Sequence, residues 1–236
     1  MAIKYKNLTI LGTSHIAKQS LKEVEDAIVR GKPDIVALEL DKKRLAALLE
    51  KKRQKPRVSD IKRIGIKGWL FSLIGAWAEK KLGEKVGVKP GSEMKKAFEL
   101  AKEKKLMIAM IDQDIEVTLR KISKSLTWKE KWNFFVDAFK TIVLKKKEVI
   151  FDLRKVPSAR VIKKLTSKVR KRYPHLYHVL VEERNSIMAN NIAEIILKHP
   201  GKKILAIMGA GHEKEIIGII KERLKQPSIS YSFTVG

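Results

Sequence analysis

The sequence predicts an α/β fold: a mainly parallel sheet with flanking helices and a helical insertion. One observation is that four short apolar runs, each bounded by turn residues, alternate with helical patterns. Another is that the runs are nearly continuous in apolar character, as in strands buried on both faces of a parallel sheet. The third is a long stretch, residues 128–200, that shows helical periodicity and no strand signal.

The predicted strands and helices follow one another in βαβ order. The four strands are Leu8–Leu11, Ile35–Leu40, Leu106–Ile111 and Ile204–Met208. A fifth candidate strand, rich in β-branched and aromatic residues, is Ile229–Val235. The helices are predicted at Gln19–Arg30, Lys42–Lys52, Glu93–Lys104 and Glu213–Leu224. We expect residues 1–236 to form a single domain that contains the insertion 128–200.

The charge of the chain predicts anionic partners. Lys and Arg number 52 against 26 Asp and Glu, a net charge of +26, and such an excess attracts an anionic membrane surface or nucleic acid. Sequence-specific DNA binding is not favoured, because no helix-turn-helix or zinc-finger spacing is present. The chain has no Cys, which excludes disulfides and thiolate catalysis and leaves His and carboxylates as metal ligands. Abundant Lys and Glu without Cys would also suit a thermophile.

The apolar segments predict no membrane span and no secretory leader. The N-terminus lacks the apolar core of a signal peptide. The longest apolar segment, Gly68–Ala78, is too short to cross a bilayer and would suit a buried or interfacial helix.

Polar residues follow each of the four strands, at the edge where open parallel sheets bind ligands. His15 follows the first strand, Glu39 ends the second, Asp112 follows the third and His212 follows the fourth. Both histidines belong to G-x-x-H segments that run from a strand into a helix. Glycine permits the tight turn and close backbone approach that such a segment needs.

Together His15, His212 and Glu39 would form a set of two histidines and one carboxylate with open positions. Such a set suits a catalytic divalent ion (Zn, Mn, Co or Fe) that makes bound water a usable nucleophile. Two alternatives remain open. Because a single G-x-x-H is a weak motif, its His could be an ordinary capping or loop residue. Glu39 could pair with a structural Arg instead of a metal. Asp114 is expected to cap the helix that begins at Ile115.

A second polar cluster, EERN, precedes a helical pattern. Glu183 and Asn190 lie seven residues apart and share a face with Ile187. Arg184 would sit at the margin of the site, where its planar fork suits a carboxylate or a developing oxyanion.

Six segments, in order and over nearly the whole chain, resemble the TraB/PrgY family: GTSH, PDIVALELDKKR, VGVKPGSEMKKAFELAKE, IDQDIEVTLRK, EERNSIMANNIAEII and IMGAGH. The family belongs to a wider group with Tiki proteins, erythromycin esterases and haem-binding ChaN-like proteins. Tiki members are regarded as metal-dependent proteases, and PrgY is linked to the shutdown of peptide pheromones. The resemblance therefore implies a hydrolase.

The resemblance also implies site residues. By position in the matching segments, they are His15, Glu39, Glu93, Arg120, Arg184 and His212. The pattern departs at Gln113, where an Arg is expected between two Asp residues. Microbial members often continue into C-terminal membrane-spanning helices. This implies membrane association in a longer form, with the present chain as its soluble, cytoplasmic-facing domain.

The function expected from the sequence is metal-dependent hydrolysis, of a peptide bond first and of a small-molecule substrate otherwise. His15, Glu39 and His212 would hold the ion or polarise water, and Arg184 would steady the oxyanion. A metal-independent esterase, with His as general base, is the alternative enzyme. A non-enzymatic module that binds anionic membrane surfaces is the third interpretation, and an oligomer is compatible with all three.

Overall fold

A computed structural model describes residues 2–13, 18–50, 57–66, 68–69, 72–73, 76, 91–130, 132–133, 136–137 and 159–225. Its centre is a five-stranded sheet in the order β1-β2-β5-β3-β4. The strands are β1 (Ala2–Tyr5), β2 (Leu8–Thr13), β3 (Ile35–Leu38), β4 (Met107–Met110) and β5 (Ile204–Gly209). Only β1 is antiparallel to its neighbour among these strands. The predicted mainly parallel α/β sheet is therefore confirmed.

The four predicted strands are present, with shifted ends. β2 runs two residues further than predicted, to Thr13, whereas β3 and β4 are shorter. The edge strand β1 was not predicted, because its four residues, AIKY, alternate in burial and are too few to give a clear apolar run. The predicted strand Ile229–Val235 lies outside the described residues.

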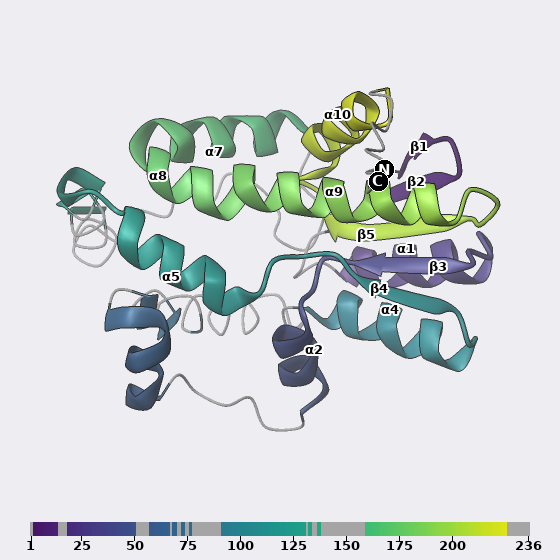
Figure 1. Cartoon of the computed structure of the whole chain (residues 1–236), viewed down its shortest axis with the longest axis horizontal. Coiled ribbons are helices and arrows are strands. Elements are labelled where there is room, and N and C mark those ends of the chain that lie inside the picture. The colour runs from purple at the N-terminus through teal and green to yellow at the C-terminus, as the bar shows by residue number, and fades with distance from the viewer. Residues whose placement is uncertain are drawn as a thin grey trace, which may run out of the picture.

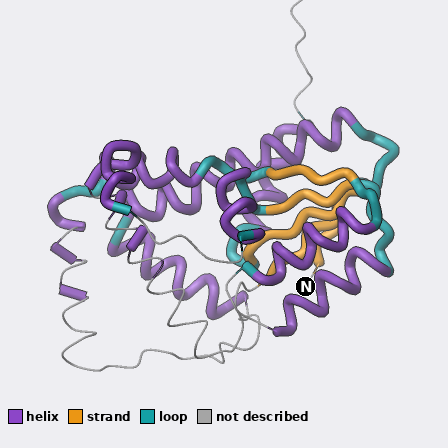
Figure 2. Tube along the Cα trace, turned by 90° about the horizontal axis from the view of Figure 1, so that it is seen from below, coloured by secondary structure: helices purple, strands orange, loops and turns teal. Residues whose placement is uncertain are grey.

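Two layers of helices cover the sheet (Figures 1 and 2). Along β5, Ile204, Ala206 and Met208 face one core and Leu205 and Ile207 face the other, as the period of two in a strand requires. The first core is closed by α9 (Glu183–Lys198) and α10 (Glu213–Arg223). The second is closed by α1 (Lys18–Val29), α2 (Lys42–Leu49) and α4 (Ser92–Glu103).

A helical arm extends from one end of the sheet (Figure 1). It contains α5 (Ile115–Ser125), α7 (Ala159–Arg172) and α8 (Pro174–Tyr177). A π-helical segment, His178–Glu182, then leads directly into α9. Ile122, Leu126 and Val179 form a small core of their own in this arm. The described part of 128–200 is helical and contains no strand, and its last helix, α9, packs on the sheet.

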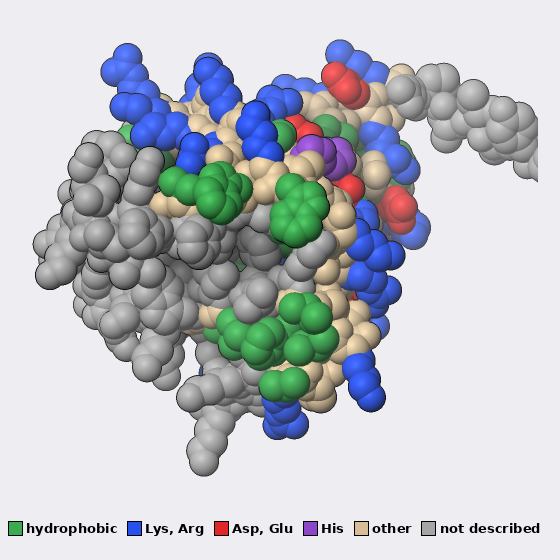
Figure 3. Space-filling view, turned by 90° about the vertical axis from the view of Figure 1, so that its left-hand side faces the viewer, with side chains coloured by type: hydrophobic (Ala, Val, Ile, Leu, Met, Phe, Trp, Pro, Cys, Tyr) green, Lys and Arg blue, Asp and Glu red, His purple; other side chains and the backbone are tan. Residues whose placement is uncertain are grey.

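The arm carries a concentrated positive charge. The 14 residues of α7, ARVIKKLTSKVRKR, include no acidic residue. Figure 3 looks onto this end of the molecule and shows Lys and Arg side chains around hydrophobic side chains that are exposed. Trp128 and Trp132, 84% and 68% exposed, are among the exposed hydrophobic residues of the chain. Binding of an anionic surface here stays a prediction.

No helix in the described part of the chain is both long enough and apolar enough to cross a membrane.

Candidate functional site

The carboxyl edge of the sheet gathers the polar residues that follow its strands. Glu39 follows β3, Asp112 follows β4 and His212 follows β5, and β3 lies between β4 and β5. Glu39 is 4% exposed, and its Oε2 accepts a hydrogen bond of 2.6 Å from the backbone N–H of Gly209. The backbone of the neighbouring strand therefore fixes this carboxylate.

Arg184 crosses from α9 to join two of these strand ends. Its Nη2 lies 2.6 Å from Glu39 Oε1, and its Nε lies 3.0 Å from Asp112 Oδ1. Its Nη1 donates to the backbone carbonyl of Leu180 at 3.1 Å. The alternative that Glu39 pairs with an Arg is thus present in the structure. All three guanidinium nitrogens hold protein groups, so Arg184 positions the two carboxylates.

A second guanidinium completes the cluster. Arg44, in the first turn of α2, bonds Asp112 and also Asp41 Oδ2, the latter at 2.6 Å. Asp41 is the N-cap of the same helix and accepts from the backbone N–H of residues 43 and 44. Three carboxylates, Glu39, Asp41 and Asp112, therefore contact two guanidiniums.

The pKa values of the buried pair shift in opposite directions. Burial of Asp112 would raise its pKa, but hydrogen bonds and charge attraction from Arg184 and Arg44 hold the pKa below its ordinary value. Burial likewise opposes the charge of Arg184, yet Asp112 and Glu39 outweigh burial and raise the pKa of Arg184. Asp112 and Arg184 are therefore both charged at neutral pH.

This arrangement predicts the effect of acid on the fold. The pKa of Asp112 is depressed in the folded protein, so its stabilising contribution is present above the ordinary pKa of about 4 and is lost as the pH falls through the lower folded value. Urea denaturation between pH 3 and 7 should show the free energy of unfolding falling below pH 4. In Asp112→Asn the fall should be shallower. Constant or rising stability towards pH 3 would contradict the assignment.

His212 is held in one tautomer by a residue of α9. Its Nδ1 lies 2.5 Å from Asn185 Oδ1, while Asn185 Nδ2 donates at 2.6 Å to Glu215 Oε2. A carboxylate only accepts, so the amide oxygen of Asn185 must face the imidazole, and Nδ1 carries the proton. The acceptor nitrogen of the neutral ring is then Nε2, which lies 3.6 Å from Glu39 Oε1.

The spacing of these two atoms fits a shared divalent ion. Two ligands at about 2.0–2.2 Å from a tetrahedral ion lie about 3.4 Å apart. A His that donates its other N–H to a protein oxygen is the usual form of a metal ligand, and His212 has this form. In the described residues no group of three His, Asp or Glu has a metal-site arrangement. The third predicted ligand, His15, lies outside them.

The strand that precedes His15 in the sequence, β2, ends at the same edge of the sheet. Thr13, the last residue of β2, pairs with Gly209 at the end of β5. A Cβ on Gly12 would lie 1.6 Å from Glu213 Oε1, so this glycine makes room for the residue after His212. The close approach predicted for the glycine of the first G-x-x-H segment is therefore real.

The other predicted residues lie on α4 and α5 and between β4 and α5. Glu93 is buried in the first turn of α4, and Arg120 is exposed on α5, where it lines a separate pocket. Gln113 is also buried and donates from Nε2 to Thr118 Oγ1 at 2.8 Å. Asp114 caps α5 as predicted, accepting from the backbone of residue 116. Catalytic roles for Glu93 and Arg120 stay predictions.

Comparison with known sequences agrees with the family resemblance of the six segments described in the sequence analysis. The sequence pattern of the TraB/PrgY/gumN family matches residues 2–229, nearly the whole chain. The chain belongs to the TraB/PrgY/gumN family. An uncharacterized protein of Methanocaldococcus jannaschii is 33% identical over 221 residues, which are 92% of this chain and 54% of the relative. The chain thus spans about half the length of that curated relative, and the family resemblance inferred from the sequence is confirmed.

Two residues of the cluster in this family member escaped the sequence-based reasoning. Arg44 stands three residues after the N-cap Asp41, a spacing that brings two side chains onto one face of a helix. Asn185 directly follows Arg184, and a polar residue with 1% exposure on an apolar helix requires a partner. Neither signal identifies the partner of its residue, because Asp112 and His212 follow strands in other parts of the sequence.

Proposed function

We propose that this TraB/PrgY/gumN family member is a metal-dependent hydrolase whose first substrate class is the peptide bond. One observation supports the proposal above others: Asn185 fixes the tautomer of His212 so that Nε2 is the acceptor nitrogen, 3.6 Å from Glu39 Oε1. A nitrogen and a carboxylate oxygen at that spacing suit a divalent ion.

His212 and Glu39 would hold the ion, with His15 as the predicted third ligand. A bound divalent ion supplies a water molecule whose pKa is lowered to near neutrality. Other residues of the chain hold these two ligands in position. Asn185 orients the ring of His212, while Arg184 and the N–H of Gly209 hold Glu39.

Removal of metal tests the proposal directly. Metal content and hydrolysis of a peptide and ester panel should be measured on one preparation, before and after dialysis against a chelator. We expect about one equivalent of Zn, Mn, Co or Fe, and loss of hydrolysis that returns when the ion is restored. Hydrolysis that survives complete removal of metal would contradict the proposal and would support His212 as general base of a metal-independent esterase.

A protein that binds no metal and hydrolyses neither substrate class would leave only the non-enzymatic interpretation.

A further inference from the structure

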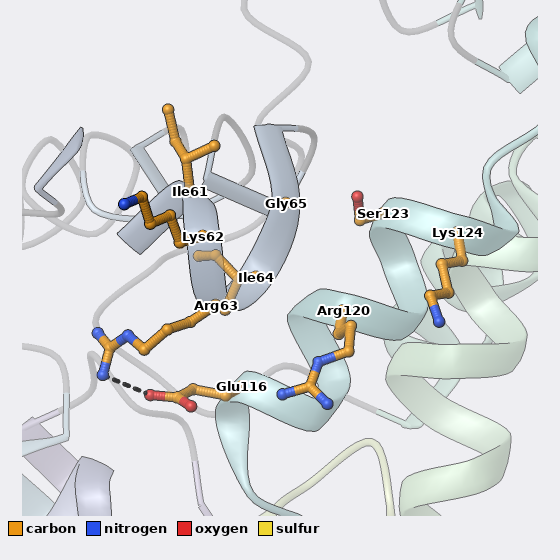
Figure 4. Close-up of a pocket in the computed structure, with 9 residues that line it drawn as sticks. All are labelled: Ile61, Lys62, Arg63, Ile64, Gly65, Glu116, Arg120, Ser123 and Lys124. Atoms are coloured by element: carbon orange, nitrogen blue, oxygen red, sulfur yellow. Dashed lines mark ion pairs between the residues drawn. The ribbon is translucent and has the colours of Figure 1, made fainter. Parts of the chain in front are cut away.

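A basic pocket lies between the helical segment 61–66 and α5, and none of its lining residues belongs to the carboxylate cluster. Its volume is about 450 Å³, within the range of small-molecule sites. Figure 4 shows Arg120 and Lys124 on the α5 side of this pocket and Arg63 reaching Glu116 from the other side. The lining residues are Ile61, Lys62, Arg63, Ile64, Gly65, Glu116, Arg120, Ser123 and Lys124.

The charges around this pocket do not balance. Its four cations are Lys62, Arg63, Arg120 and Lys124, and Glu116 is its one carboxylate. That carboxylate already pairs with Arg63 at 3.0 Å and with a lysine of α2 at 2.9 Å. Lys62, Arg120 and Lys124 form no ion pair with any residue that the structure describes. Three cations therefore share one small pocket without a counterion from that part of the chain.

The geometry of α5 keeps two of these cations together. Arg120 and Lys124 are four residues apart, so they lie on one face of the helix, where like charges repel. A bound anion would relieve that repulsion. Ser123, on the next face, offers a hydroxyl to the same pocket.

Gly65 lets the opposite wall approach closely. Its φ is +75°, and a Cβ built on it would lie 2.8 Å from Ser123 Oγ. A side chain at this position would be strained and would fill the space beside the hydroxyl. The two isoleucines of the segment, Ile61 and Ile64, supply an apolar wall next to the cations.

We propose that this pocket binds the phosphate group of a small phosphorylated ligand. A phosphate monoester carries about −1.5 to −2 charges at pH 7 and three acceptor oxygens. It therefore neutralises more of the charge of the three cations than a single carboxylate would. The fork of Arg120 suits the oxygens of such a group. This site goes beyond the proposed hydrolase activity and does not depend on it.

Calorimetric titration of the full chain with pyrophosphate tests the site. We expect saturable binding of one equivalent in 0.1 M salt. Arg120→Gln combined with Lys124→Gln should weaken it at least about tenfold, since each removes charge-assisted hydrogen bonds. Arg120→Lys, which keeps the charge but loses the fork, should give a smaller loss.

Two control variants test whether the binding belongs to this pocket. Lys129→Gln removes a charge that is also exposed but lies outside the pocket, and it should change the affinity less than about twofold. His212→Gln should bind pyrophosphate like the wild type, whereas binding at the hydrolase centre would be lost. Non-saturable binding, equal weakening by Lys129→Gln, or citrate binding as tightly as pyrophosphate would overturn the proposal.

Discussion

Arg184→Met is expected to lower the free energy of unfolding by about 3–5 kcal/mol. The side chain of Arg184 is 13% exposed, and it holds Glu39 and Asp112, whose side chains are 4% and 0% exposed. Removing it takes the guanidinium partner from the buried Glu39 and leaves Arg44 to balance the charge of Asp112. Urea denaturation at pH 7 measures the change.

Arg170→Met is the matched control for that substitution. Arg170 also pairs with a glutamate, Glu182 at 2.9 Å, but its side chain is 66% exposed. Solvent screens such a pair, so the loss should stay below about 1 kcal/mol. Equal losses in the two variants would show that the buried cluster contributes no more than a surface ion pair does.

His212→Gln is expected to abolish hydrolysis and metal binding together. The substitution removes Nε2, the acceptor nitrogen 3.6 Å from Glu39, and Gln offers no imidazole in its place. Metal content and rate should be measured on the same preparation. His178→Gln is the control, because His178 is 58% exposed and pairs with Glu182 on the arm. Full activity in His212→Gln would remove this residue from the reaction.

Glu39→Gln then separates the two roles of its carboxylate. If Glu39 is a ligand, metal affinity falls with activity. If it is the general base, the metal stays bound while the rate falls by about 10²–10⁴-fold. If it serves only as the partner of Arg184, the variant loses thermal stability and keeps its specific activity.

The sheet could be predicted from the sequence because its strands are buried on both faces. Four apolar runs between turn residues are hard to confuse with helices of ten or more residues. The four predicted helices begin within one residue, and end within three residues, of those in the structure. The strand β1 carries no such signal, because it is a short edge strand with an exposed lysine.

The candidate site was predictable only along the sheet edge. The rule that ligands lie at the carboxyl ends of parallel strands brings Glu39, Asp112 and His212 together without any knowledge of side chains. The approach of α9 to that edge depends on how the helix packs. The bonds made by Arg184 and Asn185 therefore needed the structure.

The π-helical segment His178–Glu182 makes the packing of the arm sensitive to the number of residues in one helical turn. It continues without a break into α9, which is held on the sheet by its own buried face, so the number of residues in that turn sets how the arm before it is rotated relative to Arg184 and Asn185. Each residue of an α-helix advances the chain by about 100°. Loss of one residue here would rotate Val179, which belongs to the small core of the arm, away from its place relative to α9. We therefore expect this turn to tolerate substitutions of its side chains but not insertions or deletions.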